Sequence, residues 1–238
     1  NTYYIAAAGG HQDYAGNEVN ALDLMRDAPA WVQIRAPSAN NQIIGTASPG
    51  YPGSGYPQFF LDNRPAPSHT YSSQHYIPAQ DRVITFYNEG WTGNGQETAA
   101  WPGGYTYTGS SRSFSFNLTT GDWDAPDYVP QWNPGGDWIS RLSVQHPVTG
   151  DVYICNGLNS IGADRGLWRY NAASNTLTQV NVNTYRGTWY CGAAIDPTRS
   201  RMLIVGDYSG TAAPLVLGLD GNTIAVTFGG LGAGALTF

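Results

Sequence analysis

Side chains that could do chemistry occur together between residues 88 and 111. Glu89 and Glu97 could form the carboxylate pair with which a glycosidase protonates and attacks a glycosidic bond. The same segment is rich in aromatic side chains, which combine a large apolar face with a polar group and stack on sugar rings or protein partners. These residues are Trp91, Trp101, Tyr105 and Tyr107. The segment is therefore a candidate for either an enzyme site or a binding surface.

A second aromatic segment spans residues 37–67 and carries Tyr51, Tyr56, Phe59 and Phe60 among many Gly, Pro and Asn residues. Long inserted segments of this composition form surface loops, and surface loops commonly carry binding residues. A structural alternative remains open for both segments, in which the aromatic side chains pack the loops against the rest of the protein. Solvent exposure of the aromatic side chains distinguishes the two alternatives.

Metal and cofactor sites have little support in the sequence. Asp122, Asp124 and Asp127 could supply carboxylates for a glycosidase or oxygen ligands for Ca²⁺, and so could the Asp13 to Glu18 stretch, but neither cluster has the spacing of a calcium loop. Zinc spacings, phosphate-binding loops, Ser-His-Asp motifs and dinucleotide fingerprints do not occur. We therefore predict no cofactor, with calcium as the alternative.

The composition excludes several classes of protein. The 238 residues contain 30 glycines and 15 prolines, 13% aromatic residues, no lysine and a net charge of -6. Such a chain lacks the basic surface that binds nucleic acid or anionic lipid. No apolar run approaches the roughly 18 residues of a membrane span. The aromatic content argues against disorder.

The spacing of glycine and proline predicts an all-β protein. Only residues 167–186 run twenty positions without either residue, and that stretch is rich in Asn, Thr, Val and Tyr, which are poor helix formers. Short strands separated by frequent turns are the remaining architecture.

Two hairpins recur along the chain. In the first, a proline opens a turn, a charged residue follows four positions later, and an apolar strand comes next. The pairs are Pro78 and Arg82, Pro147 and Asp151, and Pro197 and Arg201. In the second, an Asp or Asn ends a strand and a large apolar residue opens the returning strand, because Asx side chains stabilise such turns. These pairs are Asp23 and Trp31, Asn117 and Trp123, Asn171 and Leu177, and Asp220 and Ile224.

Two hairpins make a four-stranded antiparallel meander of roughly fifty residues, and four such repeats in series predict a β-propeller. The expected repeats are residues 1–36, 68–128, 138–183 and 187–228, with insertions at 37–67 and 88–111. The chain resembles kelch-type propellers, including the propeller domain of galactose-oxidase-like proteins. The resemblance rests on Gly9-Gly10-His11, on Gly16 to Leu24 followed by Trp31, and on Phe116 to Trp123. The diglycine occurs only in the first repeat.

The first repeat begins at its second strand, and residues 231–238 could supply the missing innermost strand. A closed four-bladed ring and a four-blade part of a larger propeller are both open. Resemblance to galactose oxidase would imply a copper site, but His11, His69, His75 and His146 match none of its ligand motifs. For Cys155 and Cys191, buried thiols and a single disulfide are the alternatives.

These observations favour a non-catalytic binding or assembly module. We expect it on an exposed surface, as a secreted protein or a component of a virion or cell surface, and we expect the aromatic loops to contact a glycan or a protein. One alternative is a carbohydrate-active enzyme, a hydrolase or an oxidase, that uses residues 88–111. The other is a purely structural component of a larger assembly.

Overall fold

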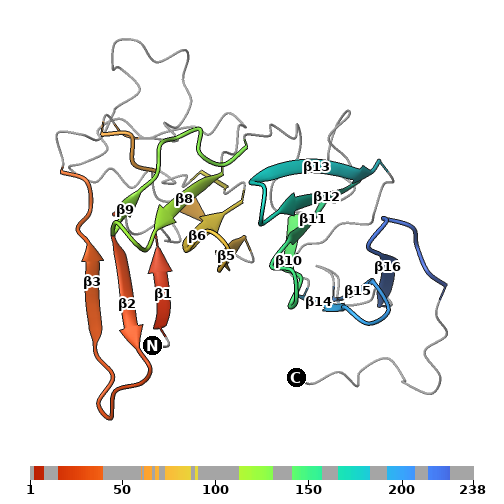
Figure 1. The fold of residues 1–238 in the computed structure, drawn as a ribbon, viewed down its shortest axis with the longest axis horizontal. Coiled ribbons are helices and arrows are strands. Elements are labelled where there is room, and N and C mark those ends of the chain that lie inside the picture. The colour runs from red at the N-terminus through yellow and green to blue at the C-terminus, as the bar shows by residue number, and fades with distance from the viewer. Residues whose placement is uncertain are drawn as a thin grey trace. The chain divides into compact units, whose positions relative to one another are not determined.

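The fold was analysed in a computed structural model (Figure 1). It describes residues 3–7, 16–39, 60, 62–65, 68–69, 73–86, 89–90, 113–130, 141–156, 166–182, 192–206 and 214–225. All regular elements in these ranges are β-strands, so the predicted all-β class is confirmed. None of the described residues belongs to a helix with the length and apolar character needed to cross a membrane. The chain divides into two compact units, Asn1–Asn133 and Pro134–Phe238.

The first compact unit contains two main antiparallel sheets (Figure 1). The first sheet has the order β1-β2-β3, with β1 at Tyr3–Ala7, β2 at Val19–Asp23 and β3 at Trp31–Arg35. The second sheet has the order β5-β6-β8-β9, with β5 at Gln74–Ile77, β6 at Arg82–Thr85, β8 at Phe114–Asn117 and β9 at Asp122–Trp123. A separate two-stranded ribbon pairs β4 (Ser68–His69) with β7 (Glu89–Gly90).

The second compact unit contains the third and fourth sheets. The third sheet has the order β10-β11-β12-β13, with β10 at Arg141–Gln145, β11 at Val152–Asn156, β12 at Gly166–Asn171 and β13 at Thr176–Asn181. The fourth sheet has the order β14-β15-β16, with β14 at Gly192–Asp196, β15 at Arg201–Val205 and β16 at Leu215–Gly218. A bridge between Leu217 and Thr223 is all that the described residues show of a fourth strand.

Each compact unit has an apolar core between its two sheets. In the first unit, Ala7 and Val19 of the first sheet pack against Val83 and Phe116 of the second. Trp123 closes this core by meeting Phe116 edge to face, at 5.2 Å between ring centroids. The core of the second unit joins the third and fourth sheets through Leu142, Tyr153, Cys155, Leu167, Met202, Ile204 and Leu217. Cys155 is a buried thiol, as one alternative predicted, and Cys191 lies outside the described residues.

The predicted proline turns share one backbone conformation. The residue just before the charged position has a positive φ in all three turns, at 51° for Asp81, 76° for Gly150 and 51° for Ser200. A left-handed residue at the end of the loop lets the strands twist correctly across the hairpin. The backbone carbonyls of Asp81 and Ser200 also accept hydrogen bonds from the next turn of their sheets, from the N–H of Leu118 at 3.1 Å and of Leu219 at 2.9 Å.

The predicted Asx turns are confirmed at the second hairpins. The side-chain oxygen of Asn117 accepts hydrogen bonds from the N–H groups of Thr119 at 2.9 Å and Thr120 at 3.2 Å. Asn171 makes the same pair of hydrogen bonds in the third sheet, both at 3.0 Å. These side chains accept hydrogen bonds from backbone N–H groups that the tight turn would otherwise leave without a partner. Strand ends are therefore set by local hydrogen bonding.

Candidate functional site

Most of the predicted ligand-contact residues lie outside the described residues. These are Tyr51, Tyr56, Trp91, Glu97, Trp101, Tyr105 and Tyr107. Glu89 is described at the backbone only, as part of β7 opposite His69. Phe60 is the aromatic residue of the two insertions that can be placed, and it is buried at 3% exposure. For Phe60 the packing alternative is therefore confirmed.

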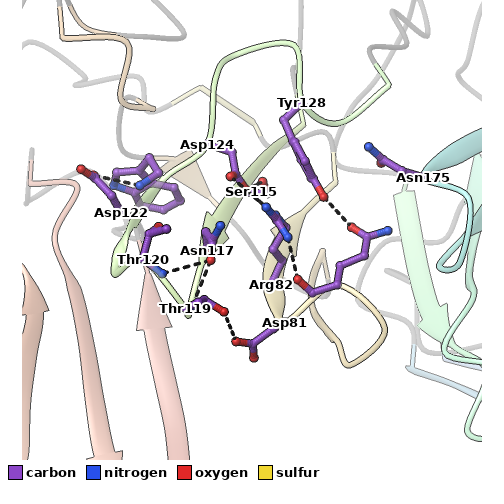
Figure 2. A network of polar contacts seen from close by, with 12 residues as sticks. Asp81, Arg82, Ser115, Asn117, Thr119, Thr120, Asp122, Asp124, Tyr128 and Asn175 are labelled. Atoms are coloured by element: carbon purple, nitrogen blue, oxygen red, sulfur yellow. Dashed lines mark hydrogen bonds and ion pairs between the residues drawn. The ribbon is translucent and has the colours of Figure 1, made fainter.

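The candidate carboxylate Asp124 is held in a structural ion pair (Figure 2). Arg82 donates from Nε to Oδ2 of Asp124 at 2.7 Å and from Nη2 to Oδ1 at 3.3 Å. The Ser115 hydroxyl donates to the same carboxylate. The guanidinium group also lies over the ring of Tyr128, 4.3 Å from its centroid. The charged residue that follows the proline turn of the second sheet thus binds the residue after the last strand of that sheet.

Asp122 is also paired with arginines. Its carboxylate lies 2.9 Å from Nη2 of Arg35 on β3 and 3.7 Å from Nε of Arg64. Asp127 is exposed. Within the described ranges, no group of three or more His, Cys, Asp or Glu side chains is placed to hold a metal ion. The aspartates that suggested a glycosidase or calcium site therefore include two that hold the first unit together.

The third sheet contains an ion pair in which the acidic and basic positions are exchanged. Here the charged residue after the proline turn is Asp151, which is buried at 4% exposure. Its Oδ2 accepts from Nε of Arg169 at 2.8 Å and from Nη2 at 2.5 Å, while its Oδ1 accepts from the N–H of Ala172 at 2.9 Å. The hydrogen bond to Asp151 raises the pKa of Arg169 above its usual value.

A groove of about 690 Å³ opens between the first and second sheets. Pairing between the strands places Ile5, Ala21 and Val32 in one row across the first sheet, and this row faces the groove. Val32 and Ile34 on β3 are 49% and 38% exposed. The opposite wall includes Val83 and Leu118 from the second sheet. The groove therefore has apolar side chains on both walls.

The opposite face of the first sheet carries Tyr4, Leu22 and Trp31, which pair across the three strands. Trp31 is 55% exposed and meets Tyr4 edge to face, with 5.9 Å between ring centroids. Val32 and Trp31 are thus neighbours in sequence with similar exposure, but they project from opposite faces of the sheet.

Carboxylates stand at the ends of both walls of the groove. Asp23 is paired with Arg26, at 3.2 Å from Nε to Oδ2. Asp81 instead accepts hydrogen bonds from neutral groups. The Tyr76 hydroxyl donates at 3.2 Å, and the Thr119 hydroxyl donates at 2.7 Å (Figure 2). No arginine of the described residues forms an ion pair with Asp81. Burial, together with the hydrogen bond and negative charge of Asp81, raises the pKa of Tyr76.

No family model matches the sequence, and no curated protein matches it. Among solved structures, the chain is similar to that of YjhT, a kelch-type propeller protein, with a TM-score of 0.51 and 13% sequence identity. The match covers 90% of this chain and 60% of YjhT. The fold is a β-propeller. The four antiparallel sheets are its blades, so the predicted fold class is confirmed, and the groove lies between the first two blades.

Sequence reasoning missed the groove between these blades. The available signal was Val32 and Ile34, two β-branched residues on the outermost strand of the first blade, with only Gln33 between them. That alternation predicts an apolar face. It does not predict whether the face is covered, because coverage depends on how closely the second blade approaches.

Proposed function

We propose that this propeller is a non-catalytic binding module that holds a partner on an exposed surface. The observation that carries the proposal is the groove between the first two blades. Exposed apolar side chains gathered in one concave site, beside a few polar groups, are typical of binding sites. Val32 and Ile34 supply the apolar wall, and Asp81 supplies a carboxylate that no arginine of the described residues neutralises.

The proposed mechanism is burial of apolar surface combined with hydrogen bonding, without chemical turnover. The walls belong to paired strands, and Leu118 and Asp81 are joined through a backbone hydrogen bond of 3.1 Å between neighbouring turns. Such a site is preorganised, so little conformational entropy is lost when a partner binds. The aromatic insertions 37–67 and 88–111 would extend the contact surface to a glycan or protein partner. We also propose that the protein is located outside the cell or on a virion or cell surface, and that it is related to the kelch-type propellers.

The experiment is a parallel binding screen of the intact protein against a glycan array and a displayed random-peptide library. We expect saturable binding to members of one collection, with the bound ligand recovered chemically unchanged. Val32→Ser should weaken that binding, whereas Trp31→Ser should not, because Trp31 projects from the opposite face with similar exposure. Conversion of the bound ligand, or no saturable binding in either collection, would contradict the proposal.

A further inference from the structure

We infer that the groove between the first two blades binds a basic, apolar peptide segment of a partner protein, with a lysine or arginine of that segment paired to Asp81. This inference rests on the proposed binding function and specifies its ligand. The apolar walls and the charge of Asp81 each support it separately.

The walls fit aliphatic side chains better than sugar rings. Sugars stack on the flat faces of aromatic residues. The walls of this groove are formed mainly by aliphatic groups, chiefly Val32, Ile34, Val83 and Leu118. Exposed β-branched side chains gain free energy by covering apolar surface, at about 25 cal/mol per Å² removed from water. A volume of about 690 Å³ accommodates several such side chains.

The charge of Asp81 points to a cation. Six of the described aspartates have an arginine within ion-pair distance, namely Asp23, Asp62, Asp122, Asp124, Asp151 and Asp196. Asp81 lines the groove without such a partner among the described residues. Arg26, the arginine of these residues that lines the groove, is bound to Asp23. A carboxylate has about four acceptor positions, and the hydrogen bonds from Tyr76 and Thr119 use two of those of Asp81. The remaining positions can accept from an ammonium or guanidinium group.

The hydroxyl groups around Asp81 orient its carboxylate in advance. Tyr76 donates to Oδ1 and Thr119 donates to Oδ2, so both oxygens are fixed before a ligand arrives. A charge-assisted hydrogen bond to a fixed carboxylate costs little ordering entropy. The net charge of -6 would also attract a basic partner over a longer range.

The test selects peptides that bind the wild-type protein from a displayed library of random twelve-residue sequences. The selected pool is then measured against Val32→Ser, Asp81→Asn, Trp31→Ser and Asp27→Asn. Asn tolerates the left-handed backbone at position 81, so Asp81→Asn removes the charge and keeps the turn. Asp27 is exposed and does not line the groove, which makes Asp27→Asn a control of equal charge change. Thermal unfolding confirms that every variant is folded.

We expect the selected peptides to be enriched in Lys or Arg beside Ile, Leu or Val. A synthetic copy of one selected peptide should lose about tenfold in affinity with Asp81→Asn, the size expected for one charge pair within a groove. It should weaken with Val32→Ser and keep wild-type affinity with Trp31→Ser and Asp27→Asn. Raising the salt concentration should weaken binding to the wild type more than to Asp81→Asn.

Selected peptides that lack basic residues, or that bind Asp81→Asn as tightly as the wild type, would overturn the inference. Binding on the glycan array without any peptide binding would overturn it as well, while leaving the proposed binding function intact. The absence of saturable binding to both the peptide library and the glycan array would contradict the proposed function itself.

Discussion

Arg82 binds both carboxylate oxygens of Asp124, and the two side chains are 19% and 12% exposed. Arg82 opens β6, whereas Asp124 follows β9. The ion pair therefore spans β8, whose residue Ser115 donates to the same carboxylate. One partly buried contact thus connects three strands of the second blade and fixes the segment that follows its last strand.

Asp124→Asn should destabilise the first compact unit. The substitution removes the charge that Arg82 and Ser115 bind, and it leaves a partly buried guanidinium without its anion. We expect a loss of about 1–3 kcal/mol in the free energy of unfolding, measured by urea denaturation. Asp127→Asn is the matched control, because Asp127 is exposed. Equal losses for both variants would contradict a structural role for Asp124.

Gly166→Ala should disrupt the third blade. Gly166 has a φ of 100°, and a Cβ placed there would lie 1.8 Å from the carbonyl oxygen of Asn181 on β13. Both the backbone conformation and the contact with a backbone atom forbid the methyl group, so we expect a loss of several kcal/mol or failure to fold. Gly192→Ala is the control, because its Cβ would meet only the Val205 side chain at 3.9 Å. Circular dichroism and urea denaturation would compare the two.

Substitutions at the left-handed turn position should have opposite effects in two blades. Gly150→Ala places a Cβ at a φ of 76° and should destabilise the protein by about 1 kcal/mol. Ser200→Gly relieves the backbone strain of a non-glycine residue at a φ of 51° and should stabilise the protein by up to about 1 kcal/mol. Thermal unfolding of the two variants provides the measurement. A loss of stability in Ser200→Gly would show that its unfolded-state entropy outweighs the strain.

Tyr76 should lose its proton only above its ordinary pKa of 10.0, because burial and the nearby charge of Asp81 both favour the neutral phenol. The folded pKa exceeds the unfolded one, so this stabilising contribution is complete below pH 10 and is lost as pH rises through the folded pKa. Carbon-13 NMR of labelled tyrosine, assigned with Tyr76→Phe, would follow the titration. Asp81→Asn should lower the pKa of Tyr76 towards its ordinary value, and an unchanged titration would contradict the contact.

Glu89→Gln and Glu97→Gln address the carbohydrate-active enzyme that residues 88–111 suggested. Under the proposed binding function, glycans recovered from the array should bind both variants as tightly as the wild type, and no product should form. Product analysis by mass spectrometry after prolonged incubation is the measurement. Turnover by the wild type that either substitution abolishes would support the enzyme and contradict the binding module.

The turns could be predicted from sequence because their causes are local. Pro78 and Asp81 belong to one four-residue turn, and Asn117 binds the backbone of its near neighbours. The partner of Arg82 could not be predicted, since Asp124 lies 42 residues away beyond a long insertion. Nor could the groove, because the exposure of Val32 depends on the spacing between two sheets. The aromatic insertions remain predictions.

The two ion pairs at the charged turn position have opposite polarity, with arginine in the second blade and aspartate in the third. Repeat proteins misassemble when similar strands compete for the same neighbour during folding. If β6 took the place of β11, Arg82 would meet Arg169, and in the reverse exchange Asp151 would meet Asp124. Like charges desolvated together oppose both mistakes. The opposite charges at this position therefore favour the placement of β6 and β11 each in its own sheet.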